Sequence, residues 1–187
     1  MFKGVLKLRK LSTRDLCFMA MLVAITVGLS ALSGFLRIGN MSKFNVSFIS
    51  VYVGAALFGP IAGGTIGALA DFVSWFINPT GPFVPVFTAI EFVNGFLFGV
   101  FLYHAPEVKK NFAITAVCVV LCVVFQYVVN IIRTYFLAHM YMGGKFYAAF
   151  ISRIPSTTIM AVVKIVVIII FEPIINRFEK IVFKSRS

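Results

Sequence analysis

The sequence predicts an all-α membrane protein, a single domain built as a bundle of six transmembrane helices. Of its 187 residues 60% are hydrophobic and only 12% are charged, and the mean hydropathy is +1.01. A soluble domain of this length could not cover so much apolar surface. The apolar runs are continuous and interrupted by glycine, whereas the strands of a membrane β-barrel would alternate polar and apolar residues. We therefore expect a polytopic helical protein in a lipid bilayer.

Six apolar runs approach the length of about 20 residues that a membrane crossing needs. They are approximately 14–35, 45–59, 61–78, 84–104, 112–137 and 149–171. A basic segment of about 1–13 precedes the first run, which exceeds the roughly 7–15 apolar residues of a signal peptide, so we expect an uncleaved first span. The second and third runs are short and are joined by Gly59-Pro60, which predicts a tight antiparallel pair. After the sixth run comes a basic tail of about 172–187, and with no long linker or repeat the domain is expected to comprise 1–187.

The third run begins with small residues at helical spacing. Gly59, Gly63 and Gly67 follow one another at intervals of four, so one face of this helix has no side chains. In lipid such a face allows another helix to approach closely. The pattern fits either packing within the bundle or a docking surface for another protein.

The distribution of Lys and Arg predicts the orientation of the helices. Eleven of them flank the runs on the side of the N-terminus and five lie on the other side, so the positive-inside rule places both termini in the cytoplasm. The same rule accounts for the net charge of +11 without a nucleic-acid partner. Among the five, Arg133 and Arg153 lie at or inside helix ends, where a bare charge is costly. We expect an anionic ligand or a buried carboxylate beside them.

Polar residues form stripes on four of the six predicted helices. The stripes are Asp71, Trp75 and Asn78; Glu91 and Asn94; Gln126, Asn130 and Arg133; and Arg153, Thr157 and Lys164. Isolated polar groups can hold helices together for about 1 kcal/mol each, but four stripes favour a cavity that binds a small polar molecule. Lys164 lies deepest, and we expect it to be a structural partner of Glu91 or Asp71 because a lone ammonium in lipid is costly.

The chain lacks the motifs of an enzyme. It has no HExxH zinc motif, no GxSxG nucleophile motif and no GK[ST] phosphate loop, so no zinc hydrolase, serine hydrolase or ATP site is indicated on this chain. His104 and His139 are predicted at opposite membrane faces and cannot share a metal. We therefore expect no catalytic residue, no metal and no cofactor.

Three stretches resemble the S components of energy-coupling factor (ECF) vitamin transporters, and within them the folate family. They are Ala20-Met-Leu-Val-Ala24, FGPIAGGTIGALAD at 58–71 and NPTGPFVPVFT at 78–88. The resemblance implies the prokaryotic cytoplasmic membrane, an outward-facing pocket and a lid at 35–44 that contains Arg37. It also implies docking, through Ala20 and Ala24, on a transmembrane coupling subunit bound to two ATPases.

A folate or reduced folate would suit the polar residues that this resemblance brings together. Asp71 or Glu91 would accept hydrogen bonds from the pterin, and Trp75, Phe83 and Phe87 would stack on its rings. Cationic side chains would bind the glutamate carboxylates. These cations are Arg37, Arg133 and Arg153, and the expected pocket also includes Asn78, Gln126 and Asn130. Two alternatives are another vitamin such as pantothenate, and a structural membrane protein whose polar stripes merely join helices.

Overall fold

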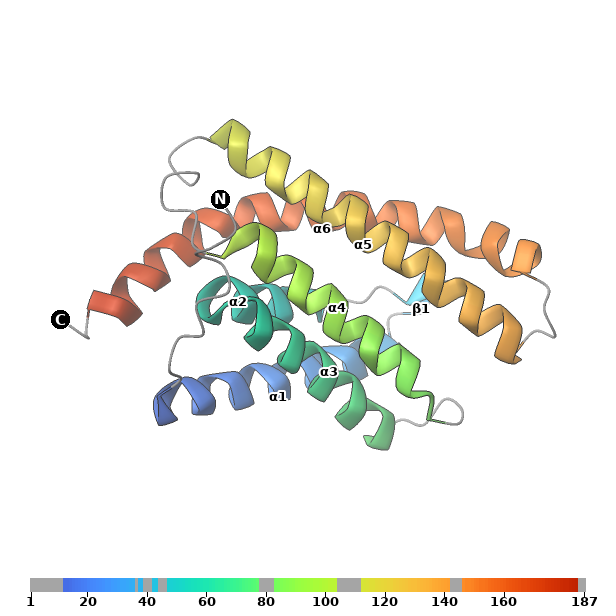
Figure 1. The fold of residues 1–187 in the computed structure, drawn as a ribbon, viewed down its shortest axis with the longest axis horizontal. Helices are drawn as coiled ribbons and strands as arrows, with labels where there is room; N and C mark the ends of the chain where they lie inside the picture. Colours follow the sequence, from blue (N-terminus) through green and yellow to red (C-terminus); the bar gives the residue numbers. More distant parts are fainter. Residues whose placement is uncertain are drawn as a thin grey trace.

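The structure, a computed structural model, is a bundle of six α-helices with a small hairpin between the first two (Figure 1). It describes residues 12–35, 37–38, 42–43, 47–77, 83–103, 112–141 and 146–184, and for some of these, including Arg37 and Arg153, the backbone only. The helices are α1 Thr13–Phe35, α2 Phe48–Phe58, α3 Pro60–Ile77, α4 Pro85–Leu102, α5 Phe112–Tyr141 and α6 Phe146–Lys184. The predicted number of six helices is confirmed.

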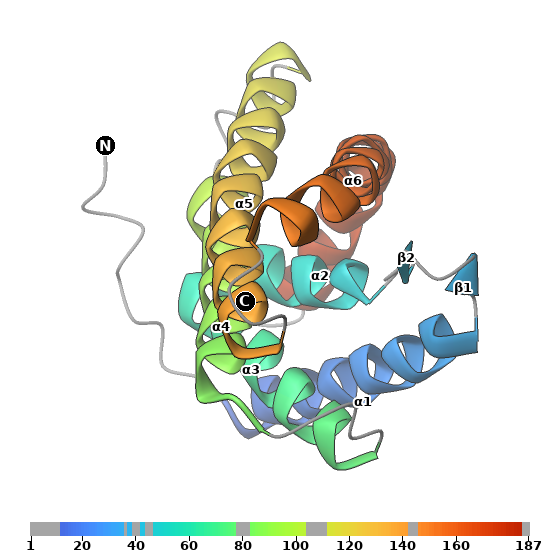
Figure 2. The ribbon, with the colours of Figure 1, turned by 90° about the vertical axis from the view of Figure 1, so that its right-hand side faces the viewer.

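Five of the six helices are long and apolar enough to cross a bilayer, and α2 is the exception. With 11 residues, α2 is only about 16 Å long, against a hydrocarbon thickness of about 30 Å. The prediction that 45–59 crosses the membrane is therefore wrong, because the helix in this segment is too short to span the hydrocarbon region. The helix is instead an internal one, since eight of its residues are buried, and Figure 2 shows it within the bundle.

The all-α prediction missed a hairpin between α1 and α2. Strands β1 (Arg37–Ile38) and β2 (Ser42–Lys43) pair antiparallel, with Arg37 opposite Lys43. Figure 2 shows them beyond the end of α1, on the way to α2. The predicted lid at 35–44 thus contains this hairpin, but most of its residues lie outside the described part of the chain. Two-residue strands give no periodic signal in a sequence.

Glycines bring α3 and α4 into backbone contact. A Cβ atom added to Gly63 would lie 2.6 Å from the carbonyl oxygen of Gly95, and one added to Gly67 would lie 2.7 Å from that of Glu91. Gly99 packs in the same way on the backbone of Pro60. The small-residue face of α3 is therefore an internal packing surface, which excludes the docking role that the sequence left open for it.

The last helix extends farther than its apolar run. It comprises 39 residues and contains Pro155 and Pro173, each of which removes a backbone hydrogen bond and favours a kink. Figure 1 shows α6 (orange to red) bending along its length. The segment 172–187, predicted as a tail, is helical as far as Lys184.

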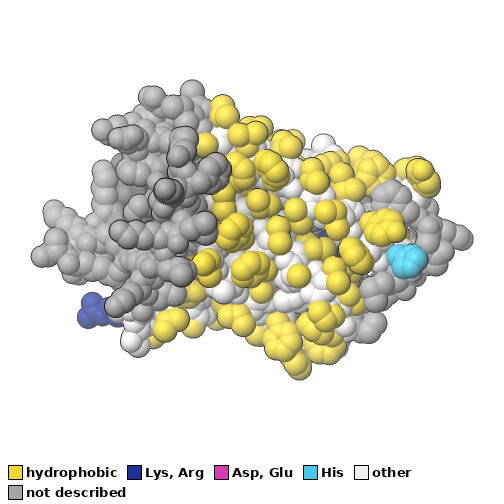
Figure 3. Space-filling model, in the orientation of Figure 1, with side chains coloured by type: hydrophobic (Ala, Val, Ile, Leu, Met, Phe, Trp, Pro, Cys, Tyr) yellow, Lys and Arg dark blue, Asp and Glu magenta, His cyan; other side chains and the backbone are white. Residues whose placement is uncertain are grey.

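The first turn of α1 and the last turn of α6 lie at the same end of the bundle (Figure 1). We call the opposite end, where α3 and α5 end and α4 and α6 begin, the distal end. Figure 3 shows hydrophobic side chains over the middle of one face, between basic and histidine side chains near its ends. This distribution fits a bundle surrounded by lipid.

Candidate functional site

The first polar pair of the distal half joins α3 to α4. The hydroxyl group of Thr88 donates a hydrogen bond to Oδ2 of Asp71 over 2.9 Å. Asp71 is also within electrostatic reach of Glu91 and Arg133. The carboxylate predicted to face a polar partner therefore has one, and it lies beside the next polar pair.

The second pair joins α4 to α5. Arg133 forms an ion pair with Glu91 through Nη1 and Oε1, and both side chains are about 30% exposed (30% and 29%). The guanidinium carbon of Arg133 also lies 5.5 Å from the centre of the Phe87 ring. Of the two partners expected for Arg133, an anionic ligand or a carboxylate, the structure supplies the carboxylate. Arg133 thus pairs with Glu91 and also lies within electrostatic reach of a second carboxylate, that of Asp71.

A third polar cluster lies deeper, one turn along α4 from Glu91 and two turns along α5 from Arg133, and joins α4, α5 and α6. The ammonium group of Lys164 donates to Oε1 of Gln126 over 3.0 Å, and Nε2 of Gln126 donates to the backbone oxygen of Asn94 over 3.1 Å. Gln126 is 1% exposed. Lys164 was expected to be a structural partner of Glu91 or Asp71, and Glu91 lies within electrostatic reach of it but does not form its hydrogen bond. The hydrogen-bond partner of Lys164 is an amide, and the rings of Phe48 and Phe98 flank the ammonium group.

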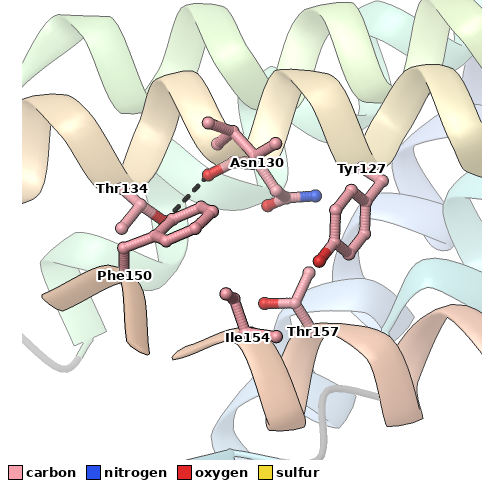
Figure 4. Close-up of a pocket in the computed structure, with 7 residues that line it drawn as sticks. Tyr127, Asn130, Thr134, Phe150, Ile154 and Thr157 are labelled. Carbon is pink, nitrogen blue, oxygen red and sulfur yellow. Dashed lines mark hydrogen bonds between the residues drawn. The ribbon is translucent and has the colours of Figure 1, made fainter. Parts of the chain in front are cut away.

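A pocket lies between α5 and α6 beside these clusters (Figure 4). The cavity itself is only about 10 Å³, room for roughly one water molecule, and it is partly open to the surroundings. The polar groups of Tyr127, Asn130 and Thr157 point into it, and Thr134 donates a hydrogen bond to the backbone of Asn130. Phe150, Ile131 and Ile154 complete its walls. Asn130, predicted as a binding residue, also donates to the backbone oxygen of Gln126 over 2.8 Å, so it connects this pocket to the deeper cluster.

Aromatic rings gather at the distal end of α3. Trp75 packs edge-on against Phe76 and Phe83, with ring centres 5.1 and 5.3 Å apart, and Phe72 contacts the same two phenylalanines. This cluster lies one turn beyond Asp71 on α3. It offers flat apolar surfaces next to the carboxylate pairs, which is the combination that an aromatic heterocycle with N–H groups would need.

The remaining predicted residues divide into two groups. Asn78 and the side chains of Arg37 and Arg153 lie outside the described part of the structure, so their binding roles stay predictions. Ala20 and Ala24 are exposed on α1, and a Cβ added to Gly28, one turn farther on, would meet nothing within 4 Å. α1 therefore presents a face of small residues that the bundle itself does not cover.

Several polar partners were not predicted from the sequence. They are Thr88, Tyr127 and Thr134, and the buried hydrogen bond from the hydroxyl of Tyr52 to Glu172. Asp71 lies six residues before the end of α3 and Thr88 lies three residues after the start of α4, and this closeness to the connected ends of successive helices is a signal that could have paired them. Tyr52 and Glu172 are 120 residues apart, and nothing in the sequence connects them.

Comparison with known proteins identifies the family. The sequence model of the family described as "ECF transporter, substrate-specific component" matches residues 14–172, which is most of the chain. The chain belongs to this family. It is therefore the substrate-binding component of a transporter.

Two relatives refine the comparison. The chain is 27% identical over 138 residues to the folate transporter FolT of Clostridium novyi (strain NT), an alignment that covers 73% of this chain and 76% of the relative. The solved structure described as FolT bound with folic acid superposes with a TM-score of 0.69 at 24% identity, covering 83% of this chain and 90% of the other. The second comparison shows that the S-component fold is shared.

Proposed function

We propose that this chain is the folate-binding S component of an ECF transporter in a prokaryotic cytoplasmic membrane. The observation that carries the substrate assignment is the alignment with a folate transporter over about three quarters of both chains. The polar geometry described above agrees with it. Pantothenate would have no use for the rings around Trp75. The match of residues 14–172 to a substrate-specific transporter component argues against a purely structural protein.

The distal clusters suit the chemistry of a pterin and its glutamate tail. Asp71 and Glu91 provide carboxylate oxygens for the N–H groups of the ring, and Trp75, Phe83 and Phe87 provide stacking surfaces. Arg133 has five N–H donors, so it can hold Glu91 in place and still bind a ligand carboxylate. Arg37 and Arg153 are proposed to add positive charge for the tail, as the site would otherwise have an excess of carboxylates.

The transport step is proposed to require partners. The exposed Ala20 and Ala24 on α1 would allow close approach of a transmembrane coupling subunit, which in turn binds two ATPases. Both termini are proposed to lie in the cytoplasm, in agreement with the excess of Lys and Arg on that side and with the common end of α1 and α6 in Figure 1. The distal end, with the polar clusters, then faces outward.

Trp75 provides a direct test because it is the only tryptophan in the chain. Titration of the purified protein in detergent with folic acid should quench its fluorescence to a saturating value, since the pterin is expected to stack beside it. Pantothenate, which has no ring system, should cause no saturable change, and Trp75→Phe should remove the signal while folic acid still binds by calorimetry. Folded protein whose fluorescence and heat of mixing are both unaffected by folic acid would contradict the proposal.

A further inference from the structure

The deep cluster of Asn94, Gln126 and Lys164 contains a buried polar atom without a partner. Asn94 is 8% exposed, and its Oδ1 accepts no hydrogen bond in the structure. Leaving a buried acceptor unsatisfied costs about 1–3 kcal/mol, so such atoms are rare in proteins and call for an explanation. A buried acceptor of this kind is explained when a ligand or a trapped water molecule donates to it.

The neighbouring donor is Lys164. One hydrogen bond of its ammonium group goes to Gln126, while an ammonium group has three N–H donors. Gln126 bonds to Lys164 through its oxygen and to the backbone of Asn94 through its nitrogen. The amide of Gln126 therefore holds a cationic donor and α4 in a fixed relation, and it acts as a positioning residue.

Asn130 joins the cluster to the lining of the pocket, because its amide nitrogen donates to the backbone oxygen of Gln126. Gln126 lies one turn below Asn130 on α5, and Lys164 lies two turns below Thr157 on α6, both of which line the pocket. On α4, Asn94 lies one turn below Glu91, on the same face. A flat ligand that reaches below the pair of Glu91 and Arg133 would meet one free acceptor and one cationic donor.

We propose that Lys164 and Asn94 form a specificity subsite for a lactam edge, which is a carbonyl oxygen next to an N–H group. Lys164 donates to the carbonyl oxygen and Oδ1 of Asn94 accepts from the N–H. This inference rests on the proposed function and deepens it, because the pterin of folic acid carries such an edge at its 4-oxo and N3–H positions. Glu91, one turn above, is then placed to accept from the 2-amino group.

The test compares two ligands that differ at this edge. Aminopterin, the 4-amino analogue of folic acid, has a donor in place of the carbonyl oxygen and an acceptor in place of N3–H, so both groups oppose the subsite. The parent protein should bind folic acid at least about tenfold more tightly than aminopterin, because a mismatched buried charge-assisted bond costs that much or more. Lys164→Met keeps the length of the side chain and should reduce this preference to less than about threefold, mainly by weakening folic acid.

A second variant guards against loss of folding. Asn94→Leu has a similar shape but removes the unpartnered oxygen, so the ligand-free protein should melt no lower than the parent while its affinity for folic acid falls at least about fivefold. An unchanged ligand preference in Lys164→Met, or an unchanged folic acid affinity in Asn94→Leu, overturns the subsite and assigns the cluster to structure or to a trapped water molecule. A parent protein that binds neither ligand refutes the proposed function itself, and the subsite with it.

Discussion

The contact between α3 and α4 sets the geometry of the site, and Gly67→Ala tests it. A Cβ at position 67 would lie 2.7 Å from the backbone oxygen of Glu91, whereas ordinary contacts of this kind begin at 3.4 Å. The atom it meets is backbone, so the two helices must separate by about 0.7 Å. Overpacking of this kind destabilises proteins by about 1–3 kcal/mol. Because the clash is at Glu91 itself, the substitution should also displace the carboxylate and weaken folic acid binding.

Gly28→Ala is the matched control. The same Cβ on α1 meets nothing within 4 Å, and alanine favours a helix over glycine by about 1 kcal/mol, so this variant should be as stable as the parent or more so. For a chain of this size a loss of 1–3 kcal/mol lowers the melting temperature by roughly 2–12 °C. Thermal unfolding in detergent and folic acid titration measure both effects. If Gly67→Ala has the same melting temperature as Gly28→Ala and the same affinity for folic acid as the parent, close packing of α3 on α4 does not set the geometry of the site.

Three further predictions concern single contacts. Tyr52→Phe removes the donor to the buried Glu172 and should lower the free energy of unfolding by about 1–3 kcal/mol. The double variant Tyr52→Phe/Glu172→Leu should recover part of this loss. Equal stability of the parent and both variants would show that the hydrogen bond does not stabilise the fold. Thr88→Val should weaken folic acid binding because Asp71 loses its hydrogen bond, whereas Thr88→Ser keeps the hydroxyl and should bind as the parent does. Equal folic acid affinities of the two variants by calorimetry would show that the hydroxyl of Thr88 does not support binding. Ala24→Leu should leave folic acid affinity unchanged, as this residue is exposed, but should reduce uptake in cells that contain the coupling subunit and ATPases; normal uptake would place docking elsewhere.

The helices could largely be predicted from the sequence because lipid imposes a length and a composition on each span. The run 61–78 corresponds to α3 at Pro60–Ile77, within one residue at each end. The prediction failed for α2, because a short apolar helix buried by its neighbours has the same composition as one in lipid. It also stopped too early for α6, since a helix can continue beyond the bilayer once its residues become polar.

For the candidate site, the sequence predicted which polar residues share one face of a helix, but not which of these faces meet. Helical spacing placed Gln126, Asn130 and Arg133 on one face of α5, and the structure confirms that all three contribute polar contacts on this helix. Which stripe faces which depends on the rotation of each helix about its axis, and helical spacing within one segment does not determine this rotation. For this reason neither the hydrogen bond from Lys164 to Gln126 nor the unsatisfied oxygen of Asn94 could be predicted.

The most direct test of the central claim is the melting temperature of the purified protein against a panel of vitamins. A ligand that binds only the folded state at 100 times its Kd stabilises it by about 2.7 kcal/mol, a shift of several degrees for a chain of this size. We expect folic acid to raise the melting temperature with increasing concentration and pantothenate to leave it unchanged. A shift with pantothenate alone, or no shift with any vitamin for protein that unfolds cooperatively, would contradict the assignment of folate as the substrate.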